Sequence, residues 1–332
     1  MNLIELAVDL GSANTTIYQK GVGIVLKEPT VAIVQHSQKT TLKYVGNKAK
    51  QLIGKTPDNM SVVYPIREGL VVNPPVAVAL IREYLSRIVP EGLFRKQVRI
   101  LATIDSGATV NERRSIESVF HLAGYTDVVI VDSPLAMSRC IPHSTGLVVD
   151  MGAGTTQASI VSSEGIIAGL SVNISGDSIN NEISDYLLAS KHLKTGPYTA
   201  EKIKLSIASM YDNDISDMEI SGIDTITGSA VKCTLTASDL YPIIKPTIDD
   251  ICQVITTALN QSPADMLEQI YDAGIYLCGG ASLLVGLKEY IGDKLKIKVN
   301  LLQDPTNVVI NGAGTLLADK NTLSTLMHFD DK

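Results

Sequence analysis

Two stretches far apart in the chain share one pattern, in which an apolar run is followed by Asp, a Gly turn and small hydroxylated residues. Residues 6–16 read LAVDLGSANTT, and residues 147–157 read LVVDMGAGTTQ. A strand that turns back through such residues exposes several backbone N–H groups at once, and this concavity binds phosphate oxygens. Gly11, Gly152 and Gly154 permit a close approach that a Cβ would block. We therefore expect the two turns to face each other across a cleft and to hold one nucleotide between them.

The aspartates of the two turns, Asp9 and Asp150, cannot bind phosphate directly, because like charges repel. They are expected instead to hold Mg²⁺, through water, beside the phosphates. A single Asp-Gly turn after a strand is more often a plain hairpin. The repetition at matching places in two halves, with a third Gly turn at LCGGASLL (residues 277–284), favours the nucleotide site.

The order of the predicted elements is also repeated, which indicates an internal duplication. Each half begins with a meander of three short strands and continues with a helix and a strand. The helices are predicted over residues 74–89, 109–124, 176–191, 238–260, 281–292 and 305–319. Thr109 and Glu112 have the spacing of a capping box. Pro242 and Pro246 are expected to bend the first turns of their helix, and residues 211–235 have the polar, turn-rich composition of an insertion with strands.

Composition limits the class of protein. The chain has 332 residues, enough for two domains, with 45% hydrophobic and 19% charged residues, so we expect buried surface against another copy. The net charge of −7 without a basic run makes a nucleic-acid partner unexpected. The four cysteines show no close pairing, which favours reduced thiols in the cytoplasm. The N-terminus has no basic leader, and no apolar run reaches the roughly 20 residues that span a bilayer.

A second phosphate motif is nearly present but is not expected to function. Residues 49–56 read AKQLIGKT, which differs from the phosphate loop G-x-x-x-x-G-K-[ST] at its first glycine. That loop needs a strand before it and a helix that carries the Lys and Thr, whereas the preceding residues are polar and helix-like and Pro57 follows at once. Lys55 is therefore predicted to be a surface or cleft-edge residue.

The chain carries a set of further motifs almost from end to end, which read DLGSANT, KEPTVAIV, VGNKAKQLIGKTP, VNERRSI, VVDMGAGTTQASIVS, ISGD, TAEKIKLSIAS, LCGGASLL and GAGTLL. In order and spacing they resemble the MreB family of bacterial actins, within the superfamily of actin, Hsp70 and sugar kinases. Sugar kinases and Hsp70 share the turns but not the EPTVAIV or AEKIK segments. Because it has no Trp and departs from the family pattern as described below, the chain resembles the divergent MreB paralogues of wall-less, swimming mollicutes.

The resemblance implies an α/β, actin-like ATPase fold, with two duplicated ribonuclease-H-like domains, four subdomains and a central nucleotide cleft. The first domain is expected over residues 1–146, with a smaller subdomain at about 33–75, and is completed by residues 313–332. The second domain is expected over residues 147–312, with a smaller subdomain at about 187–250.

The resemblance also implies the residues that bind ATP or ADP with Mg²⁺. The first phosphate turn would comprise Asp9, Gly11, Ser12, Ala13 and Asn14, and the second Asp150, Gly152, Gly154, Thr155 and Thr156, with Gly176 and Asp177 close by. Glu201 and Lys204, one helical turn apart, would reach the ribose and adenine. The adenine pocket would be lined by Gly279, Gly280, Ala281 and Ser282.

The chain departs from the family pattern at the site of hydrolysis. Members of the family normally carry a Glu before the Pro of the segment written here as VDSPLAM, and that Glu orients the attacking water; here the position is Ser133. Serine is a poor base at neutral pH, and the adjacent Asp132 is expected to point to the opposite face of its strand. Ala153 and Gln157 also replace the usual residues of DIGGGTTE. We therefore predict nucleotide binding with weak or slow hydrolysis, with Ser133, Asp9 and Asp150 as the residues that govern it.

A further interaction is predicted at GLFRKQ, residues 92–97, where Leu93 and Phe94 stand beside basic residues. Such a tip suits an anionic membrane interface, and the family has a similar membrane loop. The alternative is that both side chains pack into their own domain.

These features predict an MreB-like cytoskeletal protein that forms filaments, as paired protofilaments, along the inner membrane surface and supports cell shape or motility. Other MreB paralogues are candidate partners. Two alternatives remain open: a sugar or acetate kinase on the same fold, which needs a carboxylate to deprotonate its acceptor, and a nucleotide-binding regulator that does not polymerise.

Overall fold

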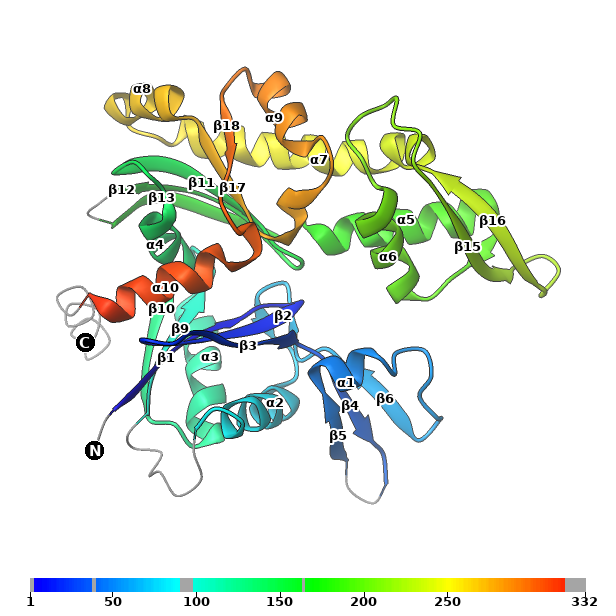
Figure 1. The fold of residues 1–332 in the computed structure, drawn as a ribbon, viewed down its shortest axis with the longest axis horizontal. Coiled ribbons are helices and arrows are strands. Elements are labelled where there is room, and N and C mark those ends of the chain that lie inside the picture. Colours follow the sequence, from blue (N-terminus) through cyan, green and yellow to red (C-terminus); the bar gives the residue numbers. More distant parts are fainter. Residues whose placement is uncertain (1–2, 38–39, 90–97, 163–164, 320–332) are drawn as a thin grey trace.

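The computed structural model describes residues 3–37, 40–89, 98–162 and 165–319. Two five-stranded sheets form the centre of the molecule, and they have the same topology (Figure 1). The first sheet has the order β10-β9-β1-β2-β3, with β1 (Ile4–Leu10), β2 (Asn14–Gln19), β3 (Gly23–Pro29), β9 (Val98–Ile104) and β10 (Asp127–Asp132). The second has the order β18-β17-β11-β12-β13, with β11 (Thr145–Met151), β12 (Thr156–Ser162), β13 (Gly165–Val172), β17 (Ile275–Cys278) and β18 (Val299–Leu301).

The pairing within the sheets confirms the duplication predicted from the sequence. In each sheet the first three strands of that half form an antiparallel meander, and the two later strands add in parallel on the other side of the first strand. Parallel pairing requires crossover connections, and helices provide them in both halves. The carboxyl ends of the first strand and its parallel neighbours therefore lie at one edge of each sheet.

Smaller elements extend from both halves, at the right of Figure 1. The first half carries a three-stranded sheet of β4 (Ala32–Gln35), β5 (Thr41–Val45) and β6 (Met60–Val63), followed by the short hairpin of β7 (Ile66–Arg67) and β8 (Leu70–Val71). The second half carries β14 (Leu193–Lys194), β15 (Asp217–Asp224) and β16 (Ala230–Thr236).

Helices cover both faces of each sheet. The helices of the first half are α1 (Gly46–Lys50), α2 (Pro74–Ser86), α3 (Val110–Ala123) and α4 (Ser133–Met137), and those after it are α5 (Gly176–Lys191), α6 (Pro197–Ile207), α7 (Ala237–Asn260), α8 (Ala264–Ala273), α9 (Leu287–Leu295) and α10 (Val308–Ala318). The predicted capping box begins α3, since Thr109 accepts from the Glu112 N–H and the Glu112 side chain accepts from the Thr109 N–H.

The helices α4 and α10 lie between the two sheets (Figure 1). Ala7 of β1 and Val148 of β11 occupy equivalent positions, and both point toward this helix pair, whereas their neighbours in sequence point toward the outer helices. The two helices pack closely at Gly312, because a Cβ there would lie 1.9 Å from the carbonyl oxygen of Ala136. The chain therefore forms layers of helices, sheet, paired helices, sheet and helices.

Two sequence-based expectations for local structure need correction. The predicted helix over 281–292 is a 3₁₀ turn (Gly280–Leu283) followed by α9, because Gly286 adopts a left-handed conformation between them. The helix predicted to end at residue 89 ends at Ser86. Pro242 and Pro246 lie inside the 24-residue α7, and the bend expected in its first turns stays a prediction. Within the described residues, no helix has the length and apolar character needed to cross a membrane.

Candidate functional site

The two Asp-Gly turns have the same hydrogen bond and face each other. Gly11 N–H donates to the carbonyl oxygen of Asn14 over 3.1 Å, and Gly152 N–H donates to that of Thr155 over 2.9 Å. A Cβ on Gly154 would lie 2.3 Å from Ser12 Oγ and 2.9 Å from the Glu68 nitrogen. The second turn therefore touches the first, and no side chain fits at Gly154 without moving one of them.

The third glycine turn meets the second at its aspartate. Gly279 follows β17 with a φ of +83°, and a Cβ there would lie 2.3 Å from Asp150 Oδ1. The remaining predicted residues of this turn, Gly280, Ala281 and Ser282, form the 3₁₀ turn, in which the Ser282 hydroxyl donates to Gly279 O over 2.6 Å. The ends of β1, β11 and β17 are thus brought together.

The start of α5 is joined to the second turn by its backbone. Gly176 N–H donates to Gly152 O over 3.0 Å, and Asp177 N–H donates to Ala153 O over 2.8 Å. Lys204 Nζ reaches back from α6 to donate to Gly176 O over 2.7 Å. Gly176 and Asp177 therefore adjoin the second turn, and Lys204 contacts the residue that joins them to it.

Other predicted turn residues differ in exposure. Ala13 and Asn14 are exposed, and Ala13 O accepts from Thr30 N–H. Thr155 is half-buried, with its hydroxyl engaged. Thr156 is fully buried at the start of β12, and its hydroxyl has no hydrogen-bond partner within the part of the chain that the structure describes.

Three aspartates converge on the centre of the site. Burial raises the pKa of Asp9 to about 6, against the hydrogen bond from the Thr103 hydroxyl, and the charge of Asp105 adds to the increase. Burial raises the pKa of Asp150 to about 7, with further contributions from Asp105 and Asp9. The charge of Asp105 destabilises both of the other carboxylates, and that of Asp9 destabilises Asp150, so the centre would gain from a bound cation.

The residues present fit a hydrated Mg²⁺ better than a directly coordinated metal. Among the described residues, no group of three or more His, Cys, Asp or Glu side chains is arranged to hold a metal ion by itself. Magnesium commonly keeps several waters and takes one or two carboxylates together with phosphate oxygens. Asp9 and Asp150 are two carboxylates that lie beside the glycine turns, and burial raises the pKa of both. They could therefore hold such an ion through its waters.

Asp105 was not identified from the sequence. It follows β9, and its carboxylate accepts hydrogen bonds from Thr155 Oγ1 (2.7 Å), Gln157 Nε2 (2.9 Å) and Ser171 Oγ (3.4 Å), all in the second half of the chain. Burial raises its pKa, while the Thr155 and Ser171 hydroxyls lower it. One sequence signal could have indicated it. Asp105 directly follows the carboxyl end of a predicted buried strand, and ligands of α/β sheets bind at the carboxyl ends of strands.

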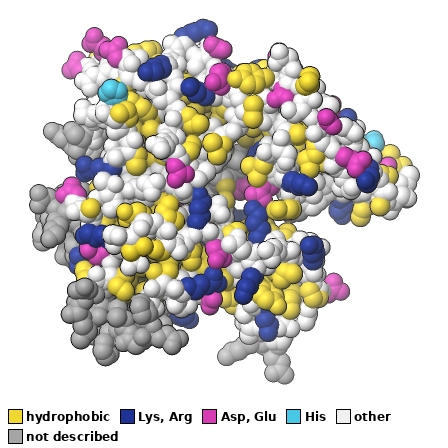
Figure 2. Space-filling view, viewed as in Figure 1, with side chains coloured by type: hydrophobic (Ala, Val, Ile, Leu, Met, Phe, Trp, Pro, Cys, Tyr) yellow, Lys and Arg dark blue, Asp and Glu magenta, His cyan; other side chains and the backbone are white. Residues whose placement is uncertain are grey.

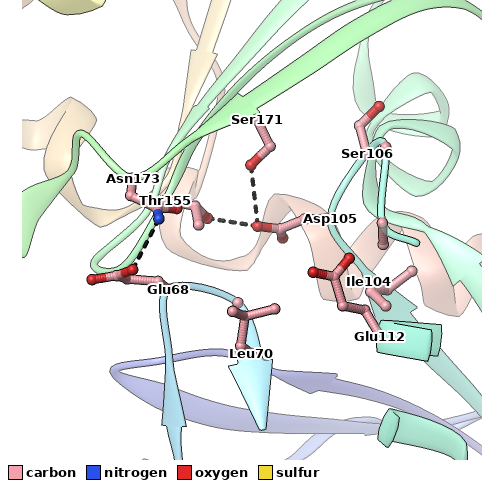
Figure 3. Close-up of a pocket in the computed structure, with 12 residues that line it drawn as sticks. Glu68, Leu70, Ile104, Asp105, Ser106, Glu112, Thr155, Ser171 and Asn173 are labelled. Atoms are coloured by element: carbon pink, nitrogen blue, oxygen red, sulfur yellow. Dashed lines mark hydrogen bonds between the residues drawn. The ribbon is translucent and has the colours of Figure 1, made fainter. Parts of the chain in front are cut away.

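A cavity of about 230 Å³ lies beside Asp105. Its walls come from both halves, and Figure 3 shows Ser171 and Thr155 pointing at the Asp105 carboxylate while Asn173 meets Glu68. Asn173 Nδ2 donates to Glu68 Oε2 over 2.9 Å. The cavity excludes Glu201, Lys204 and the third turn, so it adjoins the second phosphate turn away from the predicted adenine pocket.

The predicted ribose-binding pair lies where the two smaller extensions meet. Glu201 Oε1 accepts from Lys50 Nζ of α1 over 3.1 Å, and this lysine also lies 5.7 Å from the ring centroid of Tyr198. Burial lowers the pKa of Lys204, whereas the nearby Asp177 and Glu201 raise it. Lys55 is exposed after the end of α1, which agrees with the rejection of a phosphate loop there.

Ser133 is buried as the first residue of α4, directly after β10. The preceding Asp132 bonds to Arg113 of α3, so its carboxylate is held by an outer helix. The predicted membrane residues Leu93 and Phe94 lie outside the described residues. On the face shown in Figure 2, basic side chains are interspersed with acidic ones.

Comparison with known proteins identifies clear relatives. The family model for MreB/Mbl protein matches residues 3–325. The cell shape-determining protein MreB of Escherichia coli is 31% identical over 322 residues, covering 94% of this chain and 93% of that protein. Crystal structures of MreB5 of Spiroplasma citri bound to AMPPNP and to ADP have TM-scores of 0.91 and 0.90 at 24% and 25% identity, covering 99% and 98% of both chains. A MamK double helical filament, at 17% identity over 96% of this chain and 99% of that one, shares the fold with a TM-score of 0.79.

Replacement of Asp150 by Asn should stabilise the ligand-free protein more at about pH 8 than at about pH 5. A carboxyl group whose pKa is raised on folding binds its proton more tightly in the folded state, so stability is lost as the pH rises from the unfolded value of 3.8 to about 7. Asn removes this loss because it carries no charge. Thermal unfolding at both pH values measures the effect, with Asp185→Asn on the exposed side of α5 as the control. Equal gains at the two pH values would contradict the assignment.

Proposed function

Because this chain belongs to the MreB/Mbl family of actin-like cytoskeletal proteins, we propose that it binds ATP or ADP with Mg²⁺ between its two halves and polymerises into filaments. The contact between the two phosphate turns, at Gly154 and Ser12, is the observation that carries nucleotide binding. A phosphate chain placed along this contact would meet backbone N–H groups from both halves at once. The relatives from Spiroplasma citri, solved with AMPPNP and with ADP, support the same ligand class here.

Asp9 and Asp150 would hold the magnesium ion through its waters, because they are the two turn carboxylates raised in pKa by burial. Bound Mg²⁺ would neutralise charge on the phosphates. This chain's own residues provide the rest: the turns orient the phosphates, and Gly279 leaves room for Asp150 beside the third turn.

The base and ribose would lie toward α6. Lys204 donates to Gly176 O at the start of α5, and Glu201 lies one helical turn before it on α6. The contact of Lys50 with Glu201 joins α1 of the first half to α6 of the second, so it would respond to movement of the halves. Nucleotide would thereby bias the relative position of the halves, and with it filament assembly.

Filaments at the inner face of the membrane, with paired protofilaments, are the proposed assembly. The cell shape-determining role of MreB in Escherichia coli and the double helical filament of MamK support it. A role in cell shape or in motility, association with other MreB paralogues and kinship with the mollicute paralogues stay predictions.

Nucleotide binding and assembly can be tested together. Calorimetry should detect ATP and ADP binding in the presence of magnesium, and sedimentation should recover polymer whose amount depends on nucleotide. Gly154→Ala should weaken binding, because its Cβ would overlap Ser12 Oγ. Gly196→Ala is the matched control, since nothing lies within 4 Å of a Cβ there. Absence of binding by the unaltered protein would refute the nucleotide site, and sugar-dependent release of ADP would favour a kinase.

Slow hydrolysis is proposed because Ser133 stands where the family resemblance implies a water-orienting Glu. Ser133→Glu should raise the rate of phosphate release at saturating ATP by about tenfold or more, since general-base groups contribute roughly 10² or more. Ser138→Glu, on the short turn after α4, controls for added negative charge nearby. An unchanged rate with ATP still bound would show that Ser133 does not limit turnover.

Membrane contact is proposed at Leu93 and Phe94. The double variant Leu93→Ser with Phe94→Ser should lose co-sedimentation with vesicles that contain anionic lipid, because the apolar tip supplies the buried area. Leu122→Ser, at a leucine with 64% exposure on α3, is the matched control. Binding that survives the double variant would assign the contact to another surface.

A further inference from the structure

Position 133 lacks the expected carboxylate, but a carboxylate follows the adjacent strand, at Asp105. β9 and β10 pair in parallel, and Ile104 is opposite Asp132 at the last step of the ladder. Asp105 and Ser133 directly follow the ends of these two strands, so both lie at the same edge of the sheet. A carboxylate is therefore present one strand away from the position where the family resemblance implies one.

The Asp105 carboxylate is directed at the second phosphate turn. Thr155 Oγ1 donates its proton to Asp105 Oδ2 over 2.7 Å (Figure 3). A threonine hydroxyl has one proton and two lone pairs, so this bond leaves the oxygen free to accept a hydrogen bond from another donor. A water beside the turn can be that donor, and its own lone pair would then point away from Thr155.

Gln157 fixes the carboxylate in this orientation. Its Nε2 donates to Asp105 Oδ1 over 2.9 Å, and its Oε1 accepts from Ser106 N–H over 2.8 Å. The side chain is 2% exposed, so both bonds are shielded from solvent. The Glu that the family resemblance leads one to expect at this position would set a second negative charge against Asp105. Gln157 is therefore matched to an ionised Asp105.

We propose that Asp105 is a positioning residue for ATP hydrolysis, which acts through the Thr155 hydroxyl to orient the attacking water in the absence of a carboxylate at position 133. This inference rests on the proposed nucleotide site. The cavity beside Asp105 and Thr155 gives water a route to the turn.

In this step no side chain of the protein has to accept a proton. The water oxygen bonds to the γ-phosphorus as the bond from that phosphorus to the β-phosphate oxygen breaks, and the β-phosphate oxygen keeps the electron pair. Both water protons leave with inorganic phosphate, one of them being lost later to solvent. Because phosphoryl transfer depends mainly on placement and electrostatics, an indirect carboxylate can contribute by orientation alone, and less effectively than a direct one.

The competing explanation is that Asp105 only ties the two halves together, since its three donors all come from the second half. A cycle of variants separates the two roles. Phosphate release in a single turnover is measured for the unaltered protein, Asp105→Asn, Ser133→Glu and the double variant, with ATP affinity measured in parallel. Glu68→Gln is the matched control, because this carboxylate lines the same cavity and also bonds across the halves, to Asn173.

Asp105→Asn should slow phosphate release by roughly tenfold or more with little change in ATP affinity, since small misplacements of a reacting group can cost about a hundredfold. In the Ser133→Glu background the same change should cost no more than about twofold, because the introduced carboxylate orients the water directly. Glu68→Gln should leave the rate unchanged.

An equal loss in both backgrounds would assign Asp105 a structural role and overturn the inference. So would a lack of effect of Asp105→Asn, or an unaltered protein that binds ATP but releases no phosphate. Failure of the unaltered protein to bind ATP would instead overturn the proposed function itself.

Discussion

The contact between Gly154 and Ser12 is the constraint on which the centre of this molecule depends. Each residue belongs to a glycine turn closed by the same backbone hydrogen bond, and the turns belong to different halves of the chain. Because a Cβ at position 154 would overlap both Ser12 and the backbone of Glu68, the distance between the halves is set by the lack of a side chain. Groups from both halves can consequently act on one small ligand.

The helix pair α4 and α10 keeps the two sheets in the relation that this contact requires. Gly312 allows α10 to lie directly against the backbone of α4, and each helix packs on both sheets. Interiors packed this closely transmit displacement instead of absorbing it. Ser133 is the first residue of α4 and therefore begins an element that touches both sheets. The packing of Ser133 is therefore linked to the relative position of the two sheets.

Negative charge is the main cost of building this site. Asp9, Asp105 and Asp150 lie near one another with little solvent, and each raises the pKa of a neighbour or has its own raised by burial. Hydrogen bonds offset this charge differently at each aspartate. The Thr103 hydroxyl donates to Asp9, while three side chains of the second half donate to Asp105. Burial and the two neighbouring aspartates raise the pKa of Asp150 to about 7 although the Cys278 thiol lowers it, so the ionised form would gain from a cation from outside.

Local sequence patterns by themselves determined the duplicated strands, the capped α3, the three glycine turns and the family, because each depends on residues close together in the chain or on their order. The boundary of α9 and the position of Ser133 on a helix were not predicted, since a left-handed Gly286 and a short α4 leave weak periodic signals. Tertiary structure alone revealed Asp105. Its partners Thr155, Gln157 and Ser171 lie 50 to 66 residues away in sequence, and only the packing of one sheet edge against the other brings their side chains to its carboxylate.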